Sequence, residues 1–256
     1  MRKVSIVAPL GTSPPVITEF LQYVESVLDQ HVTDLTIIST KEPMVVEGLE
    51  LLKAAVADRY PNTHVHVVEL PFDDVDSEER SMHFTSIAAK ILRDQREKYR
   101  VDTVHLCVAG GRKEVCIILS LLAQFYDVNE VYHVVMPEVQ SFNPPLELIR
   151  HEAKELADAE DKLAYYRQKK ERLEPVLYPE PATFNVIKIP VVPYPMRTLL
   201  SMRQMLKSRK VTLTPVNSDL ISRLGNLGYI RVSRNYAYLT ADGECLLHLL
   251  EAVVSQ

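Results

Sequence analysis

The first 140 residues alternate short apolar runs with segments of helical periodicity, and this alternation limits the fold more than any other feature. The apolar runs are rich in Val and Ile at nearly every position, as is typical of strands buried on both faces. Segments of helical period, among them Pro15–Leu28, Val45–Arg59 and Arg80–Tyr99, separate them. The pattern predicts an α/β fold, a Rossmann-like doubly wound parallel sheet with right-handed crossovers. Its expected strands are Val4–Ala8, Leu35–Ser39, Val65–Leu70, Thr103–Val108 and Glu130–Val135.

Two of the turns that follow these strands share one design. The first strand ends in Gly11-Thr12-Ser13 and two prolines, and the fourth ends in Gly110-Gly111-Arg112-Lys113; each turn opens a helix. Ligands of doubly wound sheets bind beyond the carboxyl ends of the strands. A small turn that leads into a helix N-terminus also presents backbone N–H groups and partial positive charge, which suit a phosphate. We therefore expect the two turns to form two walls of one site.

The chemistry of these turns leaves two interpretations open. Glycine and serine serve turn geometry in any α/β protein, and neither turn is a GxGxxG or P-loop fingerprint. Arg112 and Lys113, however, place cations at a helix N-terminus, where the helix dipole disfavours them. An anionic ligand would explain them.

A charged segment, Leu146–Leu177, is predicted to form one long helix. Toward its end, two aromatic residues, Tyr165 and Tyr166, stand beside Arg167, Gln168, Lys169 and Lys170, a combination that can contact bases and phosphates. The alternative is a solvated basic helix end that complements the dipole. No cofactor is expected, and no His, Cys or carboxylate spacing predicts a metal site.

From Met196 the pattern changes to helices followed by two alternating strands, across a turn at Arg234-Asn235, and a closing helix. This order predicts a small winged helix-turn-helix domain over residues 196–256, after a Rossmann domain over residues 1–195. Residues 183–256 carry nine Lys/Arg against four Asp/Glu, whereas residues 1–182 carry 20 against 30. The basic module could meet DNA, but Arg223, Arg231 and Arg234 are few cations for tight binding.

The bulk composition is that of an ordinary soluble globular protein, with 46% apolar and 25% charged residues. Its apolar runs are shorter than the roughly 20 residues of a membrane helix, and its N-terminus does not resemble a secretion signal. The three cysteines, Cys107, Cys116 and Cys245, form no CxxC motif, and we expect them to be free thiols. These features favour a cytoplasmic protein without membrane contact.

The motif LGTSPPVITE (Leu10–Glu19), together with AGGRKEV (Ala109–Val115), resembles the CARF domain of type III CRISPR accessory proteins. The similarity is greatest to the ring nucleases, it covers roughly residues 1–195, and some such proteins append a winged helix. The resemblance implies a homodimer that binds cyclic oligoadenylate, most often cyclic tetra-adenylate, across its two-fold axis. It also implies metal-independent cleavage to linear di-adenylate with a 2′,3′-cyclic phosphate, which switches off antiviral signalling.

The resemblance also implies roles for individual residues. Ser13 matches the serine of the family's first turn and would orient the 2′-hydroxyl or the phosphate, and a lysine of the later helix would cover the scissile phosphate. Lys169 is the first candidate for that lysine and Lys170 the second, because the alignment there is by position only. The expected ligand-binding residues are Gly11, Thr12, Gly110, Gly111, Arg112, Lys113 and Arg167.

Two other functions compete with the ring nuclease. A CARF sensor could regulate transcription through its winged helix without turning the ligand over. An unrelated Rossmann-like enzyme could use a mononucleotide. The paired motifs favour the nuclease.

Overall fold

The computed structural model describes residues 2–126, 128–136, 139–191, 196–208, 210–212, 218–233 and 236–254. Among these residues, six strands form the main sheet, in the order β3-β2-β1-β4-β5-β6. The first five run parallel, and β6 pairs antiparallel with β5. The α/β class and the mostly parallel sheet predicted from the apolar runs are confirmed. The strands are β1 (Val4–Pro9), β2 (Val32–Ser39), β3 (His64–Glu69), β4 (Thr103–Cys107), β5 (Glu130–Val135) and β6 (Asn185–Ile189).

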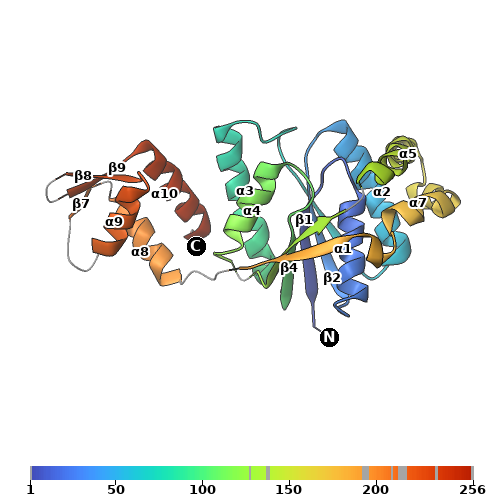
Figure 1. Ribbon diagram of the computed structural model, residues 1–256, viewed down its shortest axis with the longest axis horizontal. Helices are drawn as coiled ribbons and strands as arrows, with labels where there is room; N and C mark the ends of the chain where they lie inside the picture. Colours follow the sequence, from blue (N-terminus) through green and yellow to red (C-terminus); the bar gives the residue numbers. More distant parts are fainter. Residues whose placement is uncertain are drawn as a thin grey trace.

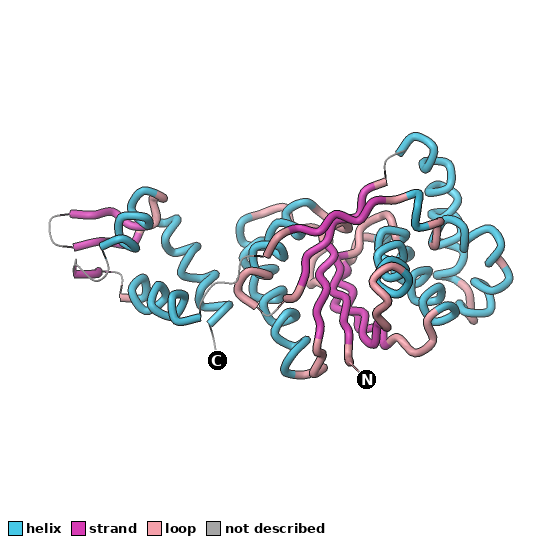
Figure 2. Tube along the Cα trace, turned by 60° about the horizontal axis from the view of Figure 1, so that its bottom comes forward, coloured by secondary structure: helices cyan, strands magenta, loops and turns pink. Residues whose placement is uncertain are grey.

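Helices cover both faces of this sheet, as Figures 1 and 2 show. On one face, α1 (Pro15–Ser26) and α2 (Pro43–Arg59) pack onto the strands through a core that includes Ile17, Phe20 and Leu52. On the other face, α3 (Glu78–Glu97) and α4 (Lys113–Leu122) close a second core. The sheet is buried on both sides, which accounts for its nearly continuous apolar strands.

The chain changes face between β1 and β4, which are neighbours in the sheet. The strands numbered one to three extend the sheet in one direction, and β4 and β5 extend it in the other. This is a topological switch point, where the loops beyond the strand ends diverge and leave room for a ligand. The two turns singled out in the sequence follow β1 and β4 and therefore flank the switch point.

The segment predicted as one long helix forms three. They are α5 (Val139–Asp158), α6 (Lys162–Gln168) and α7 (Lys170–Leu177), and the prediction of a single helix was wrong. The side chain of Asp161 caps α6 by accepting a hydrogen bond from the Ala164 N–H, so the chain restarts there instead of continuing. These helices form a third layer that packs on the outer side of α2 (Figure 1).

The C-terminal module contains the elements that the sequence predicted. The described ones are α8 (Met196–Lys207), β7 (Lys210–Thr212), α9 (Ser218–Asn226), β8 (Ile230–Ser233), β9 (Tyr236–Leu239) and α10 (Ala241–Val254). Within the described residues, the strands form a separate antiparallel sheet of order β7-β9-β8. The predicted turn at Arg234-Asn235 and most of the proline-rich linker before residue 196 lie outside the described residues.

The C-terminal module is fused to the main domain by a common core. Leu247, Leu250 and Val253 of α10 belong to the same buried cluster as Phe84 of α3 and Leu119 of α4. Polar contacts reinforce this packing: the Cys245 thiol lies 3.2 Å from a Glu78 carboxylate oxygen, and His248 Nε2 lies 3.3 Å from the Ser86 hydroxyl. The boundary placed at residue 195 stays a prediction. None of the described helices has both the length and the apolar character needed to cross a membrane.

The turns after β1 and β4 touch each other through their backbones. A Cβ on Gly110 would stand 2.2 Å from the Pro9 carbonyl oxygen, and one on Gly11 would stand 2.8 Å from the Gly111 nitrogen. Gly111 also has a positive φ of 75°, which side chains disfavour. Three glycines therefore let the two turns approach more closely than any other residues would allow.

We expect Gly110→Ala to destabilise the fold by about 3 kcal/mol, because the added methyl group forces backbone apart at the switch point. The control is Gly228→Ala: Gly228, unlike Gly110, has a positive φ of 78°, but no atom beyond its chain neighbours lies within 4 Å of its added Cβ. That change should cost only about 1 kcal/mol of backbone strain. Urea unfolding of both variants measures the difference, and equal losses would show that the contact does not constrain the fold.

Candidate functional site

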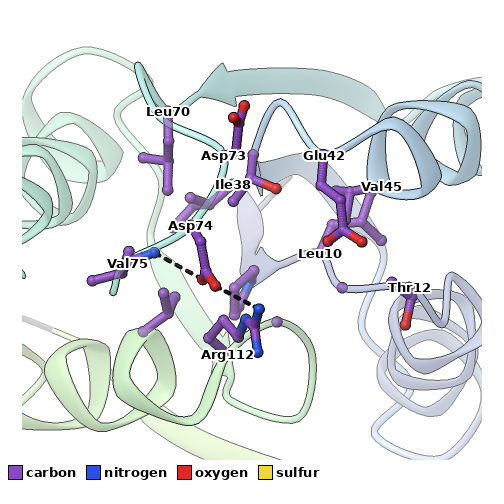
Figure 3. A pocket seen from close by; sticks show the side chains of 15 residues that line it. Leu10, Thr12, Ile38, Glu42, Val45, Leu70, Asp73, Asp74, Val75 and Arg112 are labelled. Atoms are coloured by element: carbon purple, nitrogen blue, oxygen red, sulfur yellow. Dashed lines mark hydrogen bonds and ion pairs between the residues drawn. The ribbon is translucent and has the colours of Figure 1, made fainter. Parts of the chain in front are cut away.

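A pocket of about 260 Å³ opens beside the two turns, at the carboxyl ends of the first four strands. Leu10, Gly11 and Thr12 line it from the first turn, and Gly111 and Arg112 line it from the second. Its apolar lining includes the buried side chains of Ile38, Val45, Leu70, Val75 and Val115. The expectation that both turns contribute to one cavity therefore agrees with the geometry (Figure 3).

Arg112 is anchored at this pocket by an acidic residue from another loop. Its guanidinium lies 2.5 Å from Asp74 Oδ2, and the other Asp74 oxygen accepts a hydrogen bond from the Val75 N–H at 2.8 Å. Figure 3 shows both contacts of Asp74, one to Val75 and one to Arg112 of the second turn. The Arg112 side chain is 67% exposed, so the ion pair contributes no more than about 1 kcal/mol. A phosphate anion can compete for the guanidinium at that cost.

The two turns differ in what their helices offer an anion. Arg112 occupies the N-cap of α4 and Lys113 its first position, so both cations stand where unpaired backbone N–H groups and the positive end of the dipole also point. The first turn leads into Pro14 and Pro15, which have no N–H. The start of α4 is thus better suited to an anion than the start of α1, whereas the sequence pattern treated both turns alike.

The remaining residues of the turns have distinct positions. Thr12 and Gly11 line the pocket, and Ser13 lies one residue beyond them, half-buried, at the start of α1. Gly110 is buried beneath Pro9, so its lack of a side chain serves the contact between the turns and not the approach of a ligand. Gly111 is exposed and does line the pocket.

Lys169 lies between α6 and α7 and faces α5. Its ammonium is 4.0 Å from Glu152 and 5.8 Å from the Tyr165 ring centre. Glu152 is buried, and it also accepts a hydrogen bond from the Tyr165 hydroxyl at 2.9 Å and pairs with Arg172 at 3.1 Å. The neighbouring residue on α5, Ala153, borders a narrow cleft together with Thr12 of the first turn. Lys169 itself lines neither this cleft nor the pocket beside the two turns.

Lys170 and Arg167 point elsewhere. Both pair with Asp58, at 2.8 and 2.7 Å, near the C-terminal end of α2. The pocket lies at the opposite end of that helix, where Glu42 and Val45 line it. With 1.5 Å of rise per residue, the two ends are about 20 Å apart. Within one chain, the structure brings none of Arg167, Lys169 and Lys170 to the lining of the pocket.

Sequence reasoning missed the acidic lining of the pocket. Glu42, Asp73 and Asp74 line it from the loops that follow β2 and β3. The available signal was the acidic run Asp73-Asp74-Val75-Asp76 directly after the third strand, because the carboxyl ends of all parallel strands meet at one edge of the sheet. Only the first and fourth strand ends were considered as ligand sites.

A buried carboxylic acid lies behind the first turn. Glu19 of α1 is 0% exposed, and both of its carboxyl oxygens are buried without a hydrogen-bond partner among the described residues. Burial raises the pKa of Glu19 from 4.5 to about 7. The neighbouring Cys107 thiol, at the end of β4, is fully buried, and burial raises its pKa to about 12. Both groups are neutral in mildly acidic solution, and Cys107 is inert as a nucleophile.

The fold and the paired turns define a Rossmann-like protein with a pocket beside the switch point of its sheet. Residues 13–214 match the family of CRISPR-associated proteins NE0113. Because this match spans more than half of the 256 residues, the chain belongs to that family. No protein of curated function matches the chain in sequence. The expectation of a CRISPR-associated protein is confirmed.

One solved structure shares the fold at low sequence identity. Enterococcus italicus Csm6, described as bound to cyclic hexa-2′-fluoro-hexa-dAMP, superposes with a TM-score of 0.51 and 12% identity, over 89% of this chain and 50% of that chain. The chain thus spans about half the length of the Csm6 structure. Protein VC1899 from Vibrio cholerae gives a TM-score of 0.40 and 10% identity over 98% of this chain and 66% of that chain, a likeness too distant for an argument. The similarity to Csm6 supports the CARF-type fold that the motifs predicted.

We expect Glu19→Gln to remove a pH dependence of stability. Below pH 4.5, Glu19 is protonated in both the folded and the unfolded protein. Between pH 4.5 and 7, the unfolded chain loses this proton and the folded protein keeps it. The free energy of unfolding therefore falls as pH rises through this range. Above pH 7 the loss reaches about 3 kcal/mol, and the variant should be more stable there by a comparable amount. Urea unfolding between pH 4 and 8 measures this difference.

The control for this experiment is Glu50→Gln. Burial opposes the ionisation of Glu50, but hydrogen bonds from Lys162 and Lys53 outweigh it and lower its pKa. That variant should therefore lose stability relative to wild type as pH rises, the opposite sign. A Glu19→Gln curve parallel to the wild-type curve would show that Glu19 is already ionised in the folded protein.

Proposed function

We propose that this protein binds cyclic oligoadenylate, with cyclic tetra-adenylate as the expected ring, and cleaves it without a metal ion to linear di-adenylate. The observation that carries the proposal is the position of Arg112 and Lys113. Both cations stand at the N-terminus of α4, against the hydroxyl-bearing first turn, at the switch point of the sheet. Local stability does not favour cations there, and a phosphodiester ligand explains them.

The family and the fold support this assignment. The chain belongs to a CRISPR-associated family, and it shares its fold with a Csm6 described as bound to a cyclic hexa-adenylate analogue. A ligand site at the switch point is the general expectation for such sheets. A cyclic oligoadenylate combines phosphates for the cations with bases for the adjoining pocket.

The chemistry requires alignment and charge stabilisation. The 2′-oxygen of one ribose attacks the adjacent phosphorus, the bond from phosphorus to the 5′-oxygen breaks, and the proton lost by the 2′-hydroxyl is balanced by one gained at the 5′-oxygen. The products are a 2′,3′-cyclic phosphate and a free 5′-hydroxyl. The protein has to hold the attacking and leaving oxygens in line and stabilise the additional negative charge on the phosphoryl oxygens.

Residues of the site match these tasks. Ser13 would orient the 2′-hydroxyl or the phosphate from the first turn, and Arg112 and Lys113 would hold phosphates at the start of α4. Lys169 would stabilise the developing charge from the third layer. Lys169 remains the first candidate for this role and Lys170 the second; the Lys169 ammonium lies 4.0 Å from Glu152, whereas Lys170 pairs with Asp58 near the C-terminal end of α2.

A dimer would double these elements around one ring. The α4 helix, which starts at the proposed phosphate site, exposes Ile117 (67%) and Leu121 (42%) one and two turns after Lys113. Burial of these side chains against a second copy would be favourable. A two-fold axis near α4 would bring two Arg112-Lys113 pairs to opposite halves of a ring of near-fourfold symmetry.

We expect purified protein to convert cyclic tetra-adenylate to linear di-adenylate in the presence of EDTA. Ser13→Ala and Lys169→Ala should each slow this reaction by two orders of magnitude or more, because each removes a group that acts on the reacting phosphate. Lys170→Ala is the matched control and should remain within a few-fold of wild type. Chromatography of radiolabelled cyclic tri-, tetra- and hexa-adenylate reaction mixtures gives the rates.

Two results would contradict parts of the proposal. Full turnover by the Ser13→Ala, Lys169→Ala double variant would remove both residues from the reaction. Tight binding of the ring with no cleavage over hours would remove the nuclease activity and leave a sensor.

The second candidate function is such a sensor, acting on DNA through the C-terminal module as a winged helix-turn-helix. The observation that favours it is the order of helices and strands from α8 to α10, together with the direct packing of α10 on α3. The loop before α3 carries Asp73 and Asp74, which line the pocket. Of the predicted DNA-contacting cations, Arg231 is exposed on β8; Arg234 and the Arg223 side chain lie outside the described residues.

A mobility-shift titration tests the sensor. If the module reads DNA, the shift should weaken steeply with added salt, because phosphate contacts release counterions, and cyclic tetra-adenylate should change the midpoint. Arg231→Ala should reduce the salt dependence. The absence of any salt-sensitive shift, with and without the ring, would remove this function.

A further inference from the structure

The charged residues that line the pocket are mainly negative, whereas the start of α4 beside it carries positive ones. Glu42 and Asp74 are half-buried and line it from opposite sides, Asp73 stands exposed at its edge, and Arg112 is the cation among the described lining residues. The described carboxylates do not converge into a group that could hold a metal ion. Figure 3 shows Asp74 on the side of Arg112 and Glu42 on the side of the first turn.

Such a pocket rejects the phosphates of a nucleotide. Three carboxylates against one guanidinium leave it net negative, and like charges at this range repel. The phosphates of the ligand therefore belong outside, over Gly111 and the start of α4. The cavity itself has to take a part of the ligand that carries no negative charge.

The lining specifies what that part is. The buried side chains of Ile38, Val45 and Val75 offer flat apolar walls, and carboxylate oxygens accept hydrogen bonds but cannot donate them. No hydrogen bond or ion pair within the described chain holds the Glu42 carboxylate. A planar heterocycle with an exocyclic amine satisfies all of this, and about 260 Å³ suits one base and not a dinucleotide.

We propose that this pocket is a base subsite, and that Asp74 and Glu42 select a purine by accepting hydrogen bonds from its 6-amino group. The inference rests on the proposed function, because it places the phosphates of the same ligand on Arg112 and Lys113. When the ligand binds, its phosphate replaces Asp74 as the partner of the Arg112 guanidinium. The Asp74 carboxylate, released from its 2.5 Å ion pair, then accepts a hydrogen bond from the amine. Neither group is left without a hydrogen-bond partner.

The experiment compares ligands that differ only in this amine. The probes are cyclic tetra-adenylate and the same ring built from purine riboside, in which hydrogen replaces the 6-amino group, with adenosine and purine riboside 5′-monophosphates as ring-free counterparts. Calorimetry on the Ser13→Ala background, in which turnover of the ring is slowed, should show each amine-bearing ligand binding about tenfold or more tightly than its partner, and the variants below are made in the same background. Asp74→Ala should reduce that preference to about twofold, and Glu42→Ala should reduce it as well.

The matched control is Asp76→Ala. Asp76 lies two residues from Asp74 and pairs with Arg80 at 2.9 Å, but it does not line the pocket. This variant should retain the wild-type preference. The isosteric Asp74→Asn keeps an oxygen acceptor without its charge and should show an intermediate preference, which also guards against a folding defect in Asp74→Ala.

The outcomes separate the two proposals. Equal binding of both rings would overturn the base subsite and leave the proposed function standing. Preference for adenosine monophosphate without binding of the ring would overturn the proposed function and leave the base subsite. Failure to bind any of the four ligands would overturn both.

Discussion

The contact between the turns after β1 and β4 is the constraint on which the site depends. Gly110 lies under the Pro9 carbonyl, and Gly11 lies against Gly111, at separations that leave no room for a Cβ. Because these strands are neighbours at the switch point, their turns meet before the helices diverge to opposite faces. The contact fixes Thr12 and Ser13 on one side relative to Arg112 and Lys113 on the other, which gives the site a defined width on a rigid scaffold.

Electrostatics then distinguishes two zones within this small region. The start of α4 gathers cations and backbone donors, whereas the loops after β2 and β3 bring carboxylates to the adjoining pocket. The Arg112–Asp74 ion pair joins the zones, and its exposure keeps it weak enough to be exchanged. A ligand with separate anionic and hydrogen-bond-donating parts matches this division better than a simple anion does.

The sequence allowed the sheet and both turns to be predicted, because buried strands and glycine-containing turns depend on local patterns. Arg112 and Lys113 were identifiable for the same reason, since their position opposes the helix dipole. Asp74 was not, because its importance arises from where the loop after β3 lies relative to α4. The choice between Lys169 and Lys170 was also open, as adjacent residues look alike until Glu152 and Asp58 provide their surroundings. The break at Asp161 was missed because the helical period continues through it.

The common core of α3, α4 and α10 also bears on how the molecule can be divided. Leu247, Leu250 and Val253 bury the same apolar surface that completes the packing of the main domain on that face. If either the main domain or the C-terminal module unfolded, apolar surface of the remaining one would be exposed. The two should therefore unfold in a single cooperative transition. The C-terminal module therefore supplies part of the apolar packing that covers the main domain on that face.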